Sequence, residues 1–358
     1  MIRLRKILDE IEPYEAGKRA SDLKRDLGVD ELIKLSSNES PYPPIKLAQK
    51  AMGYAAANIN RYPDGASRLL VEKLSKRLDK PTKNIIIGNG SNELIRLVAQ
   101  SVTDPGDEII YAWPSFVVYP LVAKMFEAKA VEVPLVDHRH DLKKMAASVT
   151  DKTKVIFVCN PNNPTGTIVK KDEIVEFMGA VPSDVLIVFD EAYYEFVDDS
   201  DYLSGADIFD DYPNVVVLRT FSKIYGMAGA RIGYGIAPSE VVSSMHKLRE
   251  PFNINMIAQV GAFFSLDGEG EIEKRKKKNI EEKKRIEDIL DKSGIEFARS
   301  ETNFIYTRLG KNNDEVFTRL QQLGIIVRAF GVGDYVRITV GSVSENNKVI
   351  EALERIAK

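Results

Sequence analysis

The sequence has one cysteine, Cys159, so no disulfide bond forms within the chain. It lacks a continuous apolar run of the roughly 18 residues that a membrane-spanning helix requires, and the opening Met1–Lys6 has no apolar stretch behind it. Lys and Arg (50) do not exceed Asp and Glu (53), so the basic excess of nucleic-acid-binding proteins is missing. We therefore expect a cytoplasmic protein with neither a membrane nor a nucleic-acid partner.

Histidine is also scarce, with three residues in the whole chain. His138 and His140 lie two positions apart, but zinc needs three or four ligands and no third candidate is close in sequence. The sequence thus predicts no metal site. With 358 residues, of which 44% are hydrophobic, the chain is long enough to bury a large core without disulfides or metals.

Short apolar runs alternate with longer helical patterns through the middle of the chain. Continuous apolar runs are typical of strands covered on both faces, and strands alternating with helices indicate an α/β fold with a mostly parallel, doubly covered sheet. The predicted strands are Ile85–Ile87, Glu108–Tyr111, Val155–Val158, Val185–Phe189 and Val215–Leu218.

Three parts are predicted along the chain. A large domain covers 46–270 and a small α+β domain covers 271–358, while the N-terminal segment 1–45 packs on the small domain. Between the two domains, Glu269–Ser293 is rich in Lys and Glu with sparse helical periodicity. This pattern predicts a long, solvated helix that bridges them.

Lys223 follows one of the predicted strands directly, in the segment Arg219–Lys223. Ligands of open α/β sheets bind at the carboxyl ends of strands. Thr220 and Ser222 flank the lysine with hydroxyl groups, and Arg231, eight residues on, is suited to bidentate phosphate binding. On its own the segment favours a surface lysine on a glycine-rich loop, since the chain has 50 Lys and Arg residues.

Two other strand ends carry polar side chains of a complementary kind. Asp190 and Tyr193 follow a buried strand, where an acid suits a protonated ring nitrogen, although an Asp that caps a helix fits there too. The segment Cys159–Gly166 contains two prolines and a glycine, a rigid turn that fixes the amide of Asn163. A third strand is followed by Gly88–Glu93, where backbone amides at a helix start form an anion site.

Taken together in this order, these segments resemble the motif set of the fold-type I aminotransferases, and more narrowly the histidinol-phosphate aminotransferase family. The resemblance extends over nearly the whole chain. It implies a fold-type I α/β enzyme that depends on pyridoxal 5'-phosphate. Further motifs that carry the resemblance are Glu12–Lys18, Lys34–Glu39, Arg61–Gly65, Gly324–Arg328 and Val336–Gly341.

The resemblance also implies a role for each residue around the cofactor ring. Lys223 holds the cofactor as a Schiff base and Asp190 pairs with the pyridine nitrogen. Asn163 and Tyr193 contact the phenolate oxygen, and Phe116 stacks on the ring. The cofactor phosphate is held by Ser91, Asn92, Thr220, Ser222 and Arg231.

The remaining implied roles concern substrates and assembly. Tyr62 reaches the cofactor phosphate of a neighbouring subunit, which makes the enzyme a homodimer. Arg337 binds the carboxylate of glutamate, while Tyr14, Asn38 and Arg328 are candidates for the phosphate end of the other substrate. The reaction implied is transamination between histidinol phosphate and 2-oxoglutarate in histidine biosynthesis.

Other functions stay open at this point. The same scaffold serves aromatic amino-acid aminotransferases and a phosphothreonine decarboxylase, since a fold does not fix its substrate. A nicotinamide-dependent oxidoreductase is disfavoured because Glu93 stands where the dinucleotide fingerprint has its third glycine. A non-catalytic binding protein that kept the fold is the third class.

Overall fold

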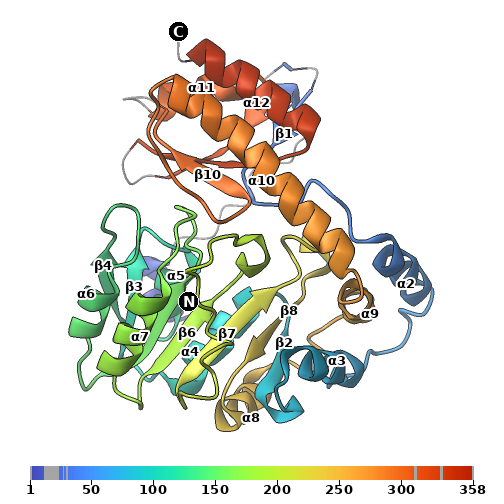
Figure 1. Ribbon diagram of the computed structural model, residues 1–358. Helices are drawn as coiled ribbons and strands as arrows, with labels where there is room; N and C mark the ends of the chain where they lie inside the picture. The colour runs from blue at the N-terminus through green and yellow to red at the C-terminus, as the bar shows by residue number, and fades with distance from the viewer. Residues whose placement is uncertain are drawn as a thin grey trace.

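The computed structural model describes residues 2–11, 24–26, 28–29, 31–309, 313–330 and 334–356. In these ranges a large sheet with helices on its faces lies beside a smaller sheet, and a long helix, α10 (Glu269–Lys292), runs from one to the other (Figure 1). The α/β class predicted from the sequence is confirmed. The limits placed at residues 46 and 270 stay a prediction.

The large sheet contains seven strands within the described residues, and β8 alone runs antiparallel to its neighbours there. The strands whose carboxyl ends carry the polar segments therefore end at one edge. Five of them correspond to the runs predicted above. In spatial order the strands are β2 (Ile85–Gly88), β8 (Gly233–Ile236), β7 (Val215–Thr220), β6 (Leu186–Asp190), β5 (Thr153–Cys159), β3 (Glu108–Trp113) and β4 (Lys129–Pro134).

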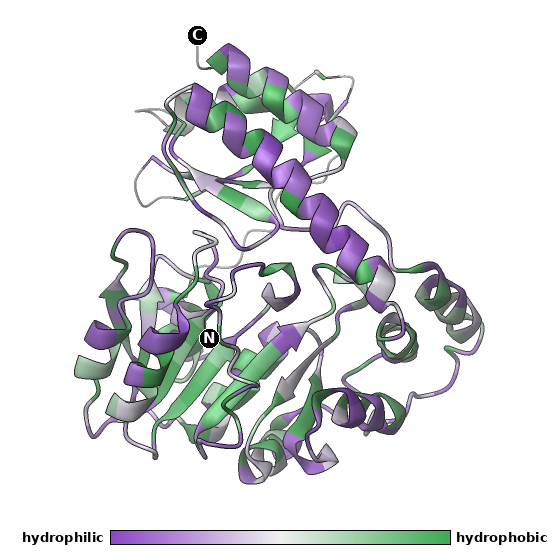
Figure 2. Cartoon of the chain, in the orientation of Figure 1, coloured by the Kyte–Doolittle hydropathy of each residue, from purple (hydrophilic) through white to green (hydrophobic). Residues whose placement is uncertain are grey.

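Both faces of this sheet are covered because successive side chains of a strand point to opposite sides. In β5, Val155 and Phe157 belong to one buried cluster, whereas Ile156 and Val158 belong to the other. The middle of each central strand is accordingly apolar, whereas polar residues stand near the strand ends (Figure 2). One cluster includes α4 (Ser91–Val102), α5 (Val118–Met125) and α8 (Ser239–Leu248), and the other includes α6 (Leu142–Ala147) and α7 (Lys171–Ala180).

Two strands of the large sheet escaped prediction for physical reasons. β4 lies at the edge, where most of its side chains are exposed or half-buried, so it has no continuous apolar run. β8 contains Gly233 and Gly235, which weaken the strand signal. A side chain at Gly233 has no room, since its Cβ would lie 2.6 Å from the backbone nitrogen of Ser91.

The smaller sheet is built from segments that are far apart in sequence. Its order is β12 (Arg328–Ala329), β13 (Val336–Thr339), β10 (Phe304–Thr307) and β9 (Phe297–Ala298), all antiparallel. Beside it, β1 (Ile33–Lys34) pairs in parallel with β11 (Ile325–Ile326), and the helices α11 (Asn313–Gln322) and α12 (Val343–Ile356) complete this unit.

The N-terminal segment divides between the two units, which differs from the expectation that all of 1–45 packs on the small domain. β1 does join the small unit, and Thr339 donates its amide to the carbonyl of Leu35. Earlier in the chain, Arg5 forms an ion pair with Glu127, and Lys124 donates to the carbonyl of Glu10. Lys124, near the end of α5, and Glu127, two residues after it, thus hold the first described residues against the large unit.

Helix α10 bridges the two units as predicted, but it is not simply solvated. Its buried face carries Arg275, Asn279 and Lys283, which are less than one-tenth exposed. These side chains donate to backbone carbonyls of loops: Arg275 to Ile224 and Pro43, Asn279 and Lys283 to Thr302. Polar residues therefore serve as core residues here, because they satisfy loop carbonyls that would otherwise be buried without partners. The remaining helices are α2 (Lys46–Ala56), α3 (Arg68–Leu78) and α9 (Met256–Ser265).

Candidate active site

The polar segments predicted at separate strand ends meet in one cavity of ≈ 590 Å³ at the carboxyl edge of the large sheet. Tyr62 lies outside this cavity, 80% exposed and stacked on Phe252 with ring centroids 4.6 Å apart. Tyr14 lies outside the described residues. All the other predicted site residues line the cavity, namely Asn38, Ser91, Asn92, Phe116, Asn163, Asp190, Tyr193, Thr220, Ser222, Lys223, Arg231, Arg328 and Arg337.

Lys223 follows β7 and extends its amine into the cavity, where Nζ lies 3.4 Å from the carbonyl oxygen of Ser37 and over the ring of Tyr193. Burial lowers the pKa of Lys223 to about 8, and the positive charges of Arg337 and Arg231 act in the same direction. An amine with this pKa exchanges protons near neutral pH, unlike an ordinary surface lysine. Lys223 is half-buried and lines the cavity, which differs from the surface lysine that its segment alone would favour.

Asp190 ends β6 on the floor of the cavity and is 2% exposed. Its Oδ2 accepts a hydrogen bond of 2.8 Å from the hydroxyl of Tyr119, but its Oδ1 has no partner among the described residues. Burial raises the pKa of Asp190 to about 6. A buried carboxylate oxygen without a partner is costly, and a donor from a bound ligand would remove that cost.

An anion site lies at the start of α4. The helix is capped by Gly90 without any side-chain hydrogen bond, which leaves the first backbone amides of the helix available to a ligand. Gly90 has φ +79, and a Cβ there would lie 2.5 Å from Nη2 of Arg231. The guanidinium of Arg231 therefore packs directly against this turn. Ser91, Asn92, Thr220 and Ser222 line the same part of the cavity.

On the opposite side of the cavity, side chains of the small unit meet those of the large one. Arg337 on β13 donates to Oδ1 of Asn163 and to the carbonyl of Ser36. The resemblance makes Asn38 a candidate for the phosphate end of a substrate, and that role stays a prediction. The Asn38 amide donates to the Tyr193 hydroxyl at 2.8 Å and accepts from Thr339, so both ends of the amide are used within the protein.

These features together test whether pyridoxal phosphate fits. The cavity offers a lysine of lowered pKa, an unpartnered carboxylate oxygen and an uncapped helix start beside an arginine. They match the aldehyde, the ring nitrogen and the phosphate of that cofactor, so the residues fit the group. When bound, pyridoxal phosphate supplies an electron sink for charge that develops on a substrate carbon.

The sequence indicated no individual role at the site for Tyr119, which contacts Asp190, or for Lys34 and Glu39, which line the cavity. Lys34 Nζ lies 3.3 Å from a carboxylate oxygen of Glu39, and both side chains are partly exposed. The only sequence signal for Tyr119 is its spacing of three from Phe116, since residues three apart share a helix face. The two rings contact each other edge to face at 5.8 Å.

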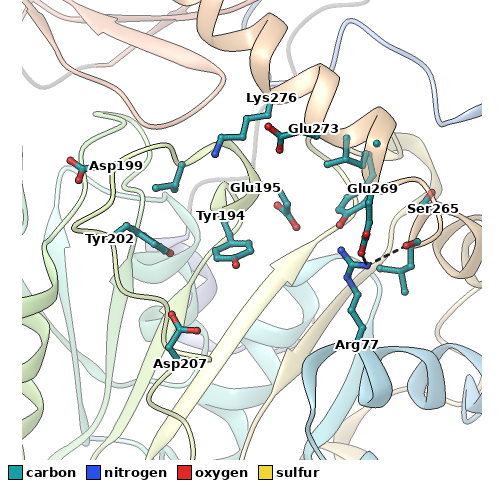
Figure 3. A pocket seen from close by; sticks show the side chains of 15 residues that line it. Arg77, Tyr194, Glu195, Asp199, Tyr202, Asp207, Ser265, Glu269, Glu273 and Lys276 are labelled. Carbon is teal, nitrogen blue, oxygen red and sulfur yellow. Dashed lines mark hydrogen bonds and ion pairs between the residues drawn. The ribbon is translucent and has the colours of Figure 1, made fainter.

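A second cavity, of ≈ 660 Å³, lies between η3 (Tyr194–Phe196) and the first turns of α10 (Figure 3). An ion pair between Arg77 and Glu269 closes one side of it. Burial raises the pKa of Glu195 in this cavity to about 7. None of the predicted site residues lines this space, and among the described residues no group of three or more His, Cys, Asp or Glu is placed to hold a metal ion.

Comparisons with known proteins agree with this geometry. Residues 30–356 match the family model described as aminotransferase class I and II. The chain is 40% identical to a histidinol-phosphate aminotransferase of Moorella thermoacetica, over 99% of this chain and 93% of that protein. It is 42% identical to an aromatic amino acid aminotransferase of Streptomyces coelicolor, over 99% and 98%.

A solved structure supports the same assignment. The crystal structure of histidinol-phosphate aminotransferase from Sinorhizobium meliloti, in complex with pyridoxal-5'-phosphate, superposes with a TM-score of 0.90 at 26% identity. The match covers all of this chain and 98% of that one. Within the described residues, no helix is both long and apolar enough to cross a bilayer. The chain belongs to the class I and II aminotransferases and is a pyridoxal-phosphate-dependent aminotransferase.

Proposed function

We propose that this enzyme transfers the amino group between histidinol phosphate and 2-oxoglutarate, with imidazole-acetol phosphate and glutamate as the products. The observation that carries the proposal is Arg328. Its guanidinium lines the cavity, and it has no hydrogen bond or ion pair with any other residue that the structure describes. A half-buried cation without a partner favours a substrate with an anionic end, such as a phosphate.

The cavity also supplies groups for the other end of each substrate. Arg337 lies close to Asn163 and is suited to bind the carboxylate of glutamate. In the reaction we propose that the Lys223 amine moves the proton between the substrate α-carbon and the cofactor carbon, since its pKa of about 8 lets it act both as base and as acid. Asp190 holds the proton on the cofactor's ring nitrogen through its free Oδ1.

An aromatic amino-acid aminotransferase is the second candidate, supported by Leu121, Val118 and Phe330, which line the same cavity with apolar side chains. The two candidates differ in one chemical requirement. Phenylalanine and tyrosine have no phosphate, and we expect their single carboxylate at Arg337, so they gain little from the Arg328 guanidinium. Histidinol phosphate gains a charge-assisted bidentate contact.

Arg328→Gln is expected to separate the candidates. For histidinol phosphate it should lower kcat/KM by ~10- to 100-fold, the loss expected from hydrogen bonds to a charged group, while kcat/KM for phenylalanine changes less than about threefold. The measurement is steady-state kinetics of both enzymes with both substrates. A wild-type enzyme that prefers phenylalanine, or an equal loss for both substrates in Arg328→Gln, would overturn the proposal.

We also propose that the active form is a homodimer in which Tyr62 completes the cofactor phosphate site of the neighbouring subunit. Tyr62 lies outside its own subunit's cavity, and exposed apolar side chains accompany it along the same stretch of chain. Exposed apolar groups of this kind mark protein interfaces. They are Leu47, Tyr54, Ile59 and Leu69.

Subunit mixing tests this arrangement directly. Lys223→Ala and Tyr62→Ala are each expected to be impaired alone. In a mixed dimer, however, one site keeps Lys223 of the Tyr62→Ala subunit and receives Tyr62 from its partner. Activity should therefore rise after the two variants are mixed under conditions that exchange subunits. A mixture whose activity equals the mean of its two components would show that each subunit works alone.

A further inference from the structure

Tyr119 is a buried residue whose contacts place it behind the cofactor site. It is fully buried, and its ring stacks on Phe157 with centroids 4.7 Å apart and planes at 9°. Its hydroxyl donates to Oδ2 of Asp190 at 2.8 Å. The packing fixes the ring, so the hydroxyl is held in one position relative to the carboxylate.

The position of Tyr119 in the chain links two cofactor contacts. Phe116 lies two residues before α5 and Tyr119 lies in its first turn, where the Tyr119 amide donates to the carbonyl of Phe116 and the two rings meet edge to face. Phe116 lines the cavity, whereas Tyr119 lies behind it. The start of α5 and the residues just before it thus carry both the aromatic ring that lines the cavity and the hydroxyl that contacts Asp190.

We propose that Tyr119 is a positioning residue for the cofactor, which fixes the Asp190 carboxylate through Oδ2 and so leaves Oδ1 as the acceptor for the ring nitrogen. The geometry supports separate roles for the two carboxylate oxygens of Asp190. Oδ2 accepts the hydrogen bond from Tyr119, whereas Oδ1 has no hydrogen-bond partner among the described residues. The inference rests on the cofactor class and not on the choice of substrate.

The electrostatics of the pair agree with the geometry. Burial keeps the pKa of Tyr119 well above its ordinary value, so the hydroxyl stays a donor. Burial raises the pKa of Asp190 to about 6, and the hydrogen bond from Tyr119 opposes that rise. Removing the hydroxyl therefore favours the protonated carboxyl. Other titratable groups that act on Asp190 or on Tyr119 are Cys159, Glu191 and Lys223, and none of them changes in the variant proposed below.

Tyr119→Phe tests the role, and Tyr111→Phe provides a matched control. Tyr111 is equally buried in the same core cluster, and its hydroxyl also donates to a carboxylate, that of Glu132, at 2.9 Å. Tyr119→Phe is expected to raise the dissociation constant for pyridoxal phosphate about tenfold at pH 8, as one hydrogen bond to a charged group implies. Tyr111→Phe should change this constant less than about twofold, because it leaves every Asp190 contact intact.

The pH dependence provides a second readout that packing alone does not move. Affinity for the cofactor falls as Asp190 becomes protonated, so in the wild type the fall begins near the pKa of about 6. In Tyr119→Phe it should begin at higher pH, and in Tyr111→Phe it should not move. An unchanged profile in Tyr119→Phe, or equal losses in both variants, would overturn the proposal.

A double-mutant cycle covers the case in which Tyr119→Phe lowers the melting temperature. In an Asp190→Ala background the packing change at Tyr119 is the same, but neither a carboxylate nor an amide is left for its hydroxyl to orient. We expect Tyr119→Phe to reduce cofactor affinity less than about twofold in that background. A tenfold reduction there as well would assign the effect to packing and refute the positioning role.

Discussion

Lys223→Ala is expected to lower transaminase activity by about 10⁴-fold or more, because in the proposed roles Lys223 is both the covalent attachment point and the proton carrier. The protein should still bind pyridoxal phosphate through the anion site at α4, but without a covalent bond. Treatment with borohydride, followed by mass spectrometry of the peptides, measures this attachment. In the wild type the cofactor should be recovered on the peptide that contains Lys223.

Lys34→Ala is the matched control for that experiment. Lys34 lines the same cavity, but its amine lies beside Glu39 and not beside Asp190 and Tyr193. Covalent labelling of Lys223 should persist in this variant. Labelling of Lys34 in the wild type, or a covalent adduct in Lys223→Ala, would show that a different lysine holds the cofactor.

Asp190→Asn is expected to reduce kcat/KM by ~10²- to 10³-fold, the range observed when one fixed electrostatic contact is removed from an active site. The hydrogen bond from Tyr119 determines how the new amide turns. Its oxygen accepts from the Tyr119 hydroxyl, so its NH₂ group faces the ring nitrogen. A donor then points at a position that needs an anion, and the ring nitrogen loses its proton.

Glu108→Gln controls for the loss of a buried carboxylate in the same sheet. Glu108 is 5% exposed at the start of β3, where Lys129 donates to it at 2.8 Å. Its removal should cost some stability, but kcat/KM should change less than about threefold because it lies at the opposite end of the strand from the site. If both variants lose activity equally, the effect at Asp190 is structural.

The central strands and the residues that follow them could be predicted because burial on both faces leaves a plain sequence pattern. Val155–Val158 and Val215–Leu218 are continuous apolar runs, and the turn segments after them carry Asn163 and Lys223. The carboxyl ends of parallel strands meet at one edge, so a mostly parallel sheet brings these side chains together. The strand pattern made Lys223 and Asp190 candidates, and their roles came from the resemblance to the aminotransferases.

Other contacts could not be predicted, because they depend on packing between distant segments. Nothing in the sequence tells that Tyr119 donates to Asp190, 71 positions away, since buried tyrosines are common in cores. The contact of Asn38 with Tyr193 depends on how the N-terminal segment enters the space between the two sheets. Edge strand β4 could not be predicted because most of its side chains are exposed, so its sequence has no continuous apolar run.

The buried polar face of α10 limits which substitutions this helix tolerates. By composition the helix looks like a surface where lysines, arginines and glutamates are interchangeable. Yet Arg275 holds both the carbonyl that follows Lys223, at Ile224, and the carbonyl of Pro43 in the N-terminal segment. Substitutions chosen to improve solubility or helix propensity along α10 could therefore remove side chains that hold the loop of Lys223 in place. Whether a position in α10 tolerates mutation should depend on whether its side chain lies on the buried face, and not on its residue type.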